Sequence, residues 1–125
     1  MTTVYAREEH LSADEYIDIV AKSGLNRPIE DRARVERMLA NANLIVTARQ
    51  DGRLVGFARS LTDFCFCCYL SDLAVDKRLI EETRAAAGGP LTTTLLLAAP
   101  TAVSFYKGIK MPQADNCFLY RRTQQ

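Results

Sequence analysis

The sequence predicts a single mixed α/β domain, in which helices cover both faces of a mostly antiparallel sheet. Three observations indicate this fold class. Predicted strands and helices alternate along the whole chain, an Asp51-Gly52 turn joins two of the strands, and a strand–helix–strand unit follows them. Such a unit forms a right-handed crossover between parallel strands, so the sheet should be antiparallel first and locally parallel later. A length of 125 residues fits one domain with its own core.

The first third of the chain predicts one strand and two helices. Residues 2–7 alternate as a short strand, and Ser12 then begins a capping pattern that includes Glu15. Apolar residues follow at helical spacing until Gly24, which ends the helix. A second helix over residues 29–41 is densely charged, which favours a solvated helix with ion pairs between residues four apart. A substrate-facing role for part of it is the alternative.

The rest of the chain predicts four further strands and a final strand, with two helices among them. Asp51-Gly52 indicates a tight hairpin, because both central residues of a type I′ turn need positive φ. A third long strand follows the hairpin, and its aromatic and small residues suit a central strand buried on both sides. The predicted elements are strands at 44–49, 54–61 and 64–75, a helix at 76–87, a strand at 92–98, a helix at 101–108 and a strand at 114–122. The order is β-α-α-β-β-β-α-β-α-β.

Charge and hydropathy argue against nucleic acid and membranes as partners. Sixteen basic residues balance fifteen acidic ones, for a net charge of +1, which gives no field that would attract a polyanion. The N-terminus lacks the pattern of a signal peptide, and the longest apolar stretch, residues 95–100, is far too short to span a bilayer. We therefore expect a cytoplasmic protein.

Four cysteines are present, at positions 65, 67, 68 and 117. We interpret them as small buried hydrophobic residues in a reducing compartment. A zinc site needs four ligands at suitable spacing, and the single histidine, His10, lies far away in the sequence. The sequence therefore predicts no metal.

Three segments, in the right order, carry a family resemblance. They are the hairpin Arg49-Gln50-Asp51-Gly52-Arg53-Leu54-Val55-Gly56-Phe57-Ala58, the strand Leu70-Ser71-Asp72-Leu73-Ala74-Val75 and the helix Ala102-Val103-Ser104-Phe105-Tyr106-Lys107-Gly108-Ile109. With the order of elements, they resemble the GNAT superfamily of N-acetyltransferases over nearly the whole chain. The resemblance implies direct transfer of an acetyl group from acetyl-coenzyme A to a primary amine.

The resemblance also implies where the cofactor would lie. The fourth and fifth strands of the family splay apart, and the pantetheine arm binds the main chain of the fourth strand there. The matching residues are Leu73, Ala74 and Val75, with a backbone N–H near Leu73 placed to polarise the thioester oxygen. Ser104 and Phe105 would line the channel.

The catalytic groups implied are a tyrosine acid and an unidentified base. Tyr106 matches the family tyrosine that protonates the departing thiolate, since a phenol holds its proton at neutral pH; a core aromatic is the alternative. Asp72 is a candidate general base, with Tyr69 or a water-mediated base as alternatives. Asp72 could equally brace a neighbouring loop.

One family motif is missing. The pyrophosphate loop Q/R-x-x-G-x-G/A should precede the third helix, but no glycine occurs between Gly56 and Gly88. Lys77 and Arg78 would supply charge to phosphates without a cradle of backbone donors; a solvated helix start is the alternative. Either the loop was deleted, naturally or by engineering, or it was left out of the sequence, or the chain is a divergent member that binds something else. The resemblance also places glycine near Lys110.

Two functions therefore compete. The first is an N-acetyltransferase acting on a small-molecule or protein amine, impaired if the loop is deleted. The second is a non-catalytic binding or regulatory module on the same fold. The resemblance implies a homodimer, and the shortened connection before the third helix favours exchange of elements between its two copies.

Overall fold

A computed structural model describes residues 2–74 and 76–123. Along the chain the elements are β1 (Val4–Glu8), α1 (Ala13–Ser23), α2 (Arg32–Ala40), β2 (Leu44–Gln50), β3 (Arg53–Thr62), β4 (Cys67–Ala74), α3 (Lys77–Ala86), the 3-10 turn η1 (Gly89–Leu91), β5 (Thr93–Leu95), the 3-10 turn η2 (Pro100–Ala102) and α4 (Val103–Gly108). The strands form one sheet in the order β1-β2-β3-β4-β5, antiparallel except for the parallel pair β4 and β5. The predicted mixed sheet is confirmed.

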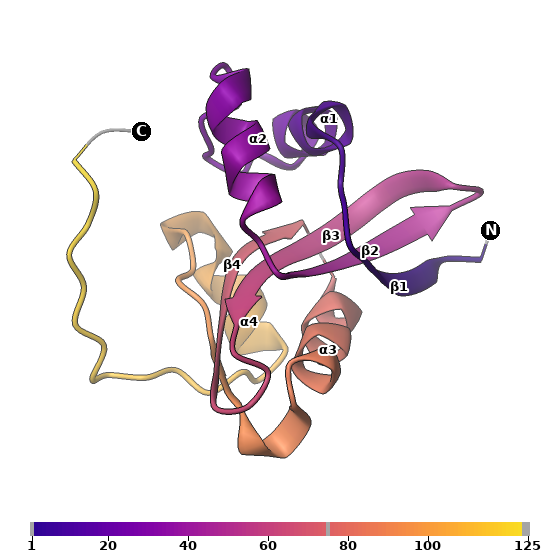
Figure 1. The fold of residues 1–125 in the computed structure, drawn as a ribbon. Coiled ribbons are helices and arrows are strands. Elements are labelled where there is room, and N and C mark those ends of the chain that lie inside the picture. The colour runs from indigo at the N-terminus through magenta and orange to yellow at the C-terminus, as the bar shows by residue number, and fades with distance from the viewer. Residues whose placement is uncertain (1, 75, 124–125) are drawn as a thin grey trace.

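Helices cover both faces of this sheet, also as predicted. α1 and α2 lie on one side and α3 and α4 on the other (Figure 1). Under the first pair, Tyr16 and Val35 pack against Phe57 of β3. Under the second pair, Leu79 of α3 packs in the cluster that contains Leu70 of β4. The sheet is therefore the shared centre of two apolar cores, which is why its inner strands are apolar on both faces.

Gly56 in β3 allows α3 to approach the sheet closely. A Cβ atom at this position would lie 2.7 Å from the carbonyl oxygen of Ala74 and 3.2 Å from Cδ1 of Leu79. Real Cβ atoms do not tolerate the first of these contacts without a shift of the backbone. The glycine of the hairpin motif thus brings the end of β4 and the start of α3 against β3.

The local sequence signals worked as predicted. The Ser12 side chain accepts a hydrogen bond from the backbone N–H of Glu15 at the start of α1, and Gly24 ends the helix with a φ of 78°. Asp51 and Gly52 both have positive φ, 51° and 79°, as a type I′ turn requires. Arg32 and Glu36 form the expected ion pair along α2.

The strand predicted at 64–75 is shorter at its start, and the prediction for the cysteines was largely wrong. Asp63 accepts hydrogen bonds from the backbone N–H groups of Cys65, Phe66 and Cys67, so the chain turns before Cys67 and the strand begins only there. Only Cys68 is buried; the other three thiols, at positions 65, 67 and 117, are exposed. Side-chain capping by Asp63 therefore outweighed the β propensity of the aromatic residues.

The last two predicted strands need larger corrections. The run predicted at 92–98 contributes only Thr93–Leu95 to the sheet, and residues 114–122 form no strand at all. These last residues run outward from the body instead (Figure 1). Alternation favours an extended backbone, but a strand also needs an edge with which to pair.

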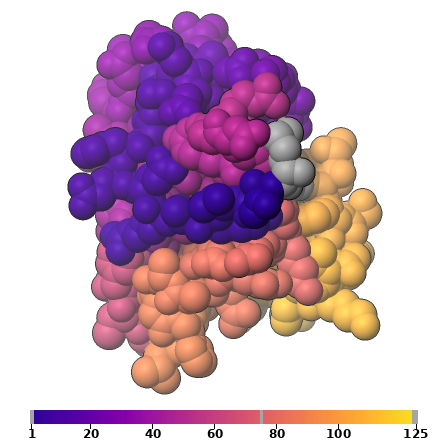
Figure 2. Space-filling model, turned by 90° about the vertical axis from the view of Figure 1, so that its right-hand side faces the viewer, coloured from indigo at the N-terminus to yellow at the C-terminus, as the bar shows by residue number. Residues whose placement is uncertain are grey.

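α3 packs beside β1 as well as over the centre of the sheet. Figure 2 shows the first strand (indigo) lying directly above α3 (salmon), with the C-terminal part of the chain (yellow) at the right-hand margin. The guanidinium group of Arg78 stacks over the ring of Tyr5 at 4.7 Å across this contact. No helix among the described residues is long and apolar enough to cross a bilayer.

Candidate active site at the fork between β4 and β5

β4 pairs with β5 over only part of its own length. The parallel ladder contains Cys67↔Thr93, Cys68↔Thr94 and Tyr69↔Leu95, and β4 then continues to Ala74. The chain after Leu95 leaves the ladder and reaches η2, which begins at Pro100. Within the described residues, the β5 side of β4 beyond Tyr69 therefore lacks a neighbouring strand. We call this opening, between the end of β4 and the chain that follows Leu95, the fork. Backbone N–H and C=O groups on such an open side can pair with an extended ligand.

α4 brings two aromatic rings to the α3 side of the sheet. Phe105 and Tyr106 both pack against the cluster that contains Leu73 of β4, and their rings meet edge to face with centroids 5.1 Å apart. Ser104, the third predicted residue of this helix, is exposed and lies outside that cluster. The structure thus groups Leu73, Phe105 and Tyr106, whereas Ser104 is exposed to solvent.

Tyr106 has the electrostatic properties of a group that keeps its proton. Burial raises the pKa of its phenol, and the positive charge of Arg27 partly opposes the shift. Its hydroxyl makes no hydrogen bond to a protein group in the part of the chain that the structure describes. A half-buried phenol with a free hydroxyl can donate its proton to a basic atom that forms beside it.

Asp72 lies on the opposite face of the sheet, and its surroundings do not suit a general base. The carboxylate is fully buried and accepts hydrogen bonds from Tyr16 Oη at 2.8 Å, from Arg59 Nε at 2.6 Å and from Arg27 Nε at 2.6 Å. Burial opposes its ionisation, but the hydrogen bond and charge of Arg59, together with Arg27, outweigh burial and lower the pKa. A saturated carboxylate with a lowered pKa is a weak base.

Arg27 is the residue at this site that the sequence did not reveal. It lies in the connection between α1 and α2, and its Nη2 also donates to the carbonyl oxygen of Ser71 at 2.7 Å. The guanidinium group binds Asp72 directly, and its positive charge also opposes the rise that burial causes in the pKa of Tyr106. One loop arginine carries no sequence signal that separates it from the chain's many other cations.

The start of α3 does not offer a phosphate cradle. The side chain of Asp76 accepts a hydrogen bond from the backbone N–H of Arg78 and another from the hydroxyl of Tyr5. Lys77 and Arg78 form ion pairs with Glu81 and Glu82 along the helix, at 3.7 Å and 3.4 Å. The first turn of α3 is therefore satisfied by a carboxylate of its own chain, which would repel a pyrophosphate.

The remaining predicted contacts fall at the end of β4. Leu73 and Ala74 are both buried and pair with Ala58 and Phe57 of β3, which leaves their strand open on the fork side. Val75 lies outside the described residues. The main chain at the end of β4 is suited to pair with an extended ligand, whereas the start of α3 is not suited to bind phosphate groups.

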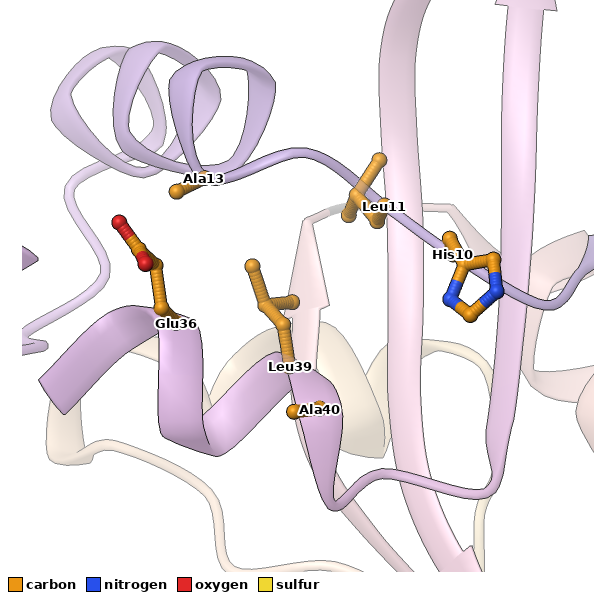
Figure 3. A pocket seen from close by; sticks show the side chains of 6 residues that line it. All are labelled: His10, Leu11, Ala13, Glu36, Leu39 and Ala40. Carbon is orange, nitrogen blue, oxygen red and sulfur yellow. The ribbon is translucent and has the colours of Figure 1, made fainter. Parts of the chain in front are cut away.

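Two hollows lie elsewhere on the surface. One of about 200 Å³ separates α1 from α2, where the Glu36 carboxylate and the His10 ring flank apolar side chains (Figure 3). The other, of about 430 Å³, lies between α3, β5 and residues 109–112. Neither hollow is lined by Tyr106 or by any residue of β4. Glu36 is moreover paired with Arg32 at 3.0 Å, so it is not a free acid.

Several solved structures that superpose on this chain are described as acetyltransferases. A probable acetyltransferase from meticillin-resistant Staphylococcus aureus superposes with a TM-score of 0.72 at 18% identity, over 97% of this chain and 99% of that one. A GNAT family acetyltransferase from Streptococcus pneumoniae gives 0.69 at 13% identity, over 98% and 100%. A ribosomal-protein-alanine N-acetyltransferase from Brucella melitensis gives 0.67 at 19% identity, over 98% and 99%.

The fold of the chain is thus that of the GNAT acetyltransferases, as the sequence predicted. No protein-family model matches the sequence, and no curated protein matches it either.

Proposed function

We propose that this chain transfers an acetyl group from acetyl-coenzyme A to a primary amine, with Tyr106 as the general acid. The observation that carries the proposal is the position of Tyr106. Its ring is half-buried on the α3 side of the sheet, in the cluster that contains Leu73 of β4, and its hydroxyl has no partner among the described residues. The similar structures carry the acetyltransferase fold, which supports this class of reaction. The acceptor amine stays unassigned, because no predicted motif marks its pocket.

The open side of β4 would hold the pantetheine arm by strand-like hydrogen bonds, and acetyl-coenzyme A would supply the thioester. The amine nitrogen bonds to the carbonyl carbon, the carbon–sulfur bond breaks, and the sulfur leaves with the electron pair. Tyr106 donates its proton to that sulfur and regains one from solvent. The amine loses its proton to water, since Asp72 is committed to Arg27, Arg59 and Tyr16.

Asp72 has a positioning role in this proposal. Arg27 donates hydrogen bonds to the Asp72 carboxylate and to the Ser71 carbonyl oxygen. These two bonds would fix the main chain of β4 at the start of the fork. β4 and β3 shift register at the same point, between Arg59 and Ser60. Three cationic and phenolic donors on one carboxylate would keep that irregular stretch of strand in a single conformation.

A non-catalytic binding module is the second candidate, and one observation favours it. The Asp76 carboxylate caps the N-terminus of α3, where the family binds pyrophosphate. A protein that gains little energy from the phosphates would bind coenzyme A weakly and could use the fork for another extended ligand. This candidate keeps the fold and gives up the transfer step.

Calorimetric titration separates the two candidates. Acetyl-coenzyme A and acetyl-pantetheine should bind within about tenfold of each other, or about 1.4 kcal/mol, because the arm and not the phosphates would provide the contacts. Thiol release with a panel of amines then tests the transfer step. Absence of binding by both compounds at about 1 mM, with the protein folded, would remove the enzyme proposal in favour of the binding module.

A further inference from the structure

The larger of the two hollows lies at the end of the β4–β5 ladder that is closed. Thr93 and Thr94 line it and pair with the first two residues of β4, whereas the fork opens only beyond Tyr69. Its other walls are α3 and residues 109–112, which follow α4. Its volume of about 430 Å³ is that of a small-molecule site. The hollow is therefore a second candidate site, and it shares no lining residue with the fork.

One side of α3 forms the long wall of this hollow. Lys77, Ile80, Glu81 and Arg84 all line it, and their spacing of three and four residues places them on one side of the helix. Lys77 pairs with Glu81 at 3.7 Å. Arg84 is exposed and has no acidic partner in the part of the chain that the structure describes. Its guanidinium group is thus available to a ligand.

The turn after α4 brings a second cation to the hollow. Lys110 lines it with a φ of 62°, a strained conformation of the kind that occurs at ligand sites. Backbone hydrogen bonds from Lys110 N to Lys107 O and from Met111 N to Tyr106 O hold the turn in place. The Lys110 ammonium group, like Arg84, forms no ion pair among the described residues. Two uncompensated positive charges therefore meet here from separate elements.

The rest of the lining is largely apolar. Ile80 is only 6% exposed, and Ile109, Met111 and Pro112 also line the hollow. Its three basic residues and one acidic residue give a net charge of +2. A guanidinium group binds a carboxylate through two parallel hydrogen bonds, and apolar side chains favour a hydrocarbon body over a hydrated inorganic anion. The lining thus matches a carboxylate that is attached to a short aliphatic chain.

We propose that this hollow binds a small aliphatic carboxylate, of the chemical class of the short and medium-chain fatty acids, as a second ligand of the protein. The carboxylate accepts hydrogen bonds from Arg84 and lies near the Lys110 ammonium group. The hydrocarbon chain covers Ile80 and Met111 and removes their apolar surface from water. This site does not depend on acetyl transfer, because neither Tyr106 nor any residue of β4 lines it.

Calorimetric titration with octanoate tests the proposal. Octanoate should bind with a Kd below about 1 mM. Acetate keeps the carboxylate but lacks the chain, so it should bind at least about tenfold more weakly. Octylamine has the same chain with the opposite charge and should not bind. Octylamine that binds as tightly as octanoate would overturn the proposal, because the hollow would then recognise only an apolar chain. Absence of octanoate binding at about 10 mM would overturn it as well.

Two substitutions locate the site. Arg84→Gln and Lys110→Gln should each weaken octanoate binding about tenfold, because each removes a charged partner of the carboxylate. Arg37→Gln is the matched control, since Arg37 lies in the last turn of α2 as Arg84 lies in the last turn of α3, and it does not line the hollow. Circular dichroism checks that each variant keeps its fold.

Three further results would contradict the proposed site. Unchanged affinity in both hollow variants would place octanoate elsewhere, and an equal loss in Arg37→Gln would mean that the overall charge of the chain attracts it. Competition between octanoate and coenzyme A would assign the hollow to the cofactor. Simultaneous binding of the two compounds, with losses only in the hollow variants, is the result that we expect.

Discussion

The carboxylate of Asp72 accepts a hydrogen bond from Nε of Arg27 at 2.6 Å, and this bond ties the middle of β4 to the connection between α1 and α2. Arg59 completes the cluster from β3, with Nε at 2.6 Å from the other carboxylate oxygen. Asp72 is fully buried and Arg59 nearly so. A buried charge is tolerated only while its partners are present, which makes this cluster sensitive to the loss of any one member.

Replacement of Asp72 by asparagine should therefore destabilise the fold strongly. The substitution keeps the size of the side chain but leaves the Arg59 charge buried without compensation, at a cost of about 3–5 kcal/mol. Urea unfolding followed by circular dichroism measures it. Asp18→Asn is the matched control, since Asp18 forms an exposed ion pair with Lys22 at 3.0 Å and should cost only about 0.3–0.5 kcal/mol. Equal effects at the two sites would contradict the buried network.

The same carboxylate should give stability an acid dependence. The pKa of Asp72 is lowered in the folded chain, so its contribution is fully present above the ordinary aspartate value and is lost as pH falls through the folded value. Stability of the native protein should thus fall more steeply below about pH 4 than that of the Asp72→Asn variant. The measured gap between the two proteins narrows with acid. A gap that stays constant from neutral pH to about pH 2.5 would mean that Asp72 is not ionised in the fold.

Local signals account for most of what the sequence predicted correctly. The Asp51-Gly52 turn and the Ser12 cap of α1 depend on neighbouring residues only, and both appear in the structure as predicted. The Arg27–Asp72 bond joins residues 45 positions apart. No spacing rule in the sequence connects those two side chains, so the role of Arg27 is evident only in the folded structure.

The errors of prediction have a common physical cause. The pattern of residues 114–122 requires only an extended backbone, and whether it forms a strand depends on a partner edge that local sequence does not describe. The prediction that the strand begins at residue 64 failed for a similar reason. Three backbone N–H groups donate hydrogen bonds to the Asp63 carboxylate, and these bonds hold residues 63–66 in a turn. Asp72 was a candidate base on the predicted fourth strand, with bracing of a loop as the alternative, and the two arginines that lower its pKa are distant in sequence.

A methyl group at Gly56 should push the end of β4 and the start of α3 away from β3. The added Cβ would meet the Ala74 carbonyl oxygen at 2.7 Å, and backbone cannot move aside as a flexible side chain can. Gly56→Ala should cost about 1–3 kcal/mol in urea unfolding. Gly108→Ala is the control, because no atom lies within 4 Å of the added Cβ at the end of α4, and stability there should be unchanged or rise by up to about 1 kcal/mol. A neutral Gly56→Ala variant would refute the close approach of α3.

Loss of the Tyr106 hydroxyl should slow acetyl transfer without loosening the fold. Tyr106→Phe keeps the edge-to-face contact with Phe105 but removes the proton donor, so kcat should fall about 10²–10⁴-fold with little change in KM. Because the pKa of Tyr106 is raised, the native rate should decline only above the ordinary tyrosine value, and the variant should lack that alkaline limb. An unchanged thermal midpoint serves as the control for packing. A kcat equal to that of the native protein would remove Tyr106 as the acid.

Glycine at position 110 should stabilise the turn that follows α4. Lys110 has a φ of 62°, in the left-handed region where a side chain costs about 1–2 kcal/mol. Glycine avoids that cost but adds about 0.4–1 kcal/mol of freedom to the unfolded chain, so Lys110→Gly should raise stability by up to about 1 kcal/mol. Lys107→Gly, inside α4, removes the same side chain from helical backbone and should lower stability by about 1 kcal/mol. Thermal unfolding of both variants shows whether each substitution raises or lowers stability. A loss of stability at position 110 as large as that at position 107 would mean that the backbone of Lys110 is not strained.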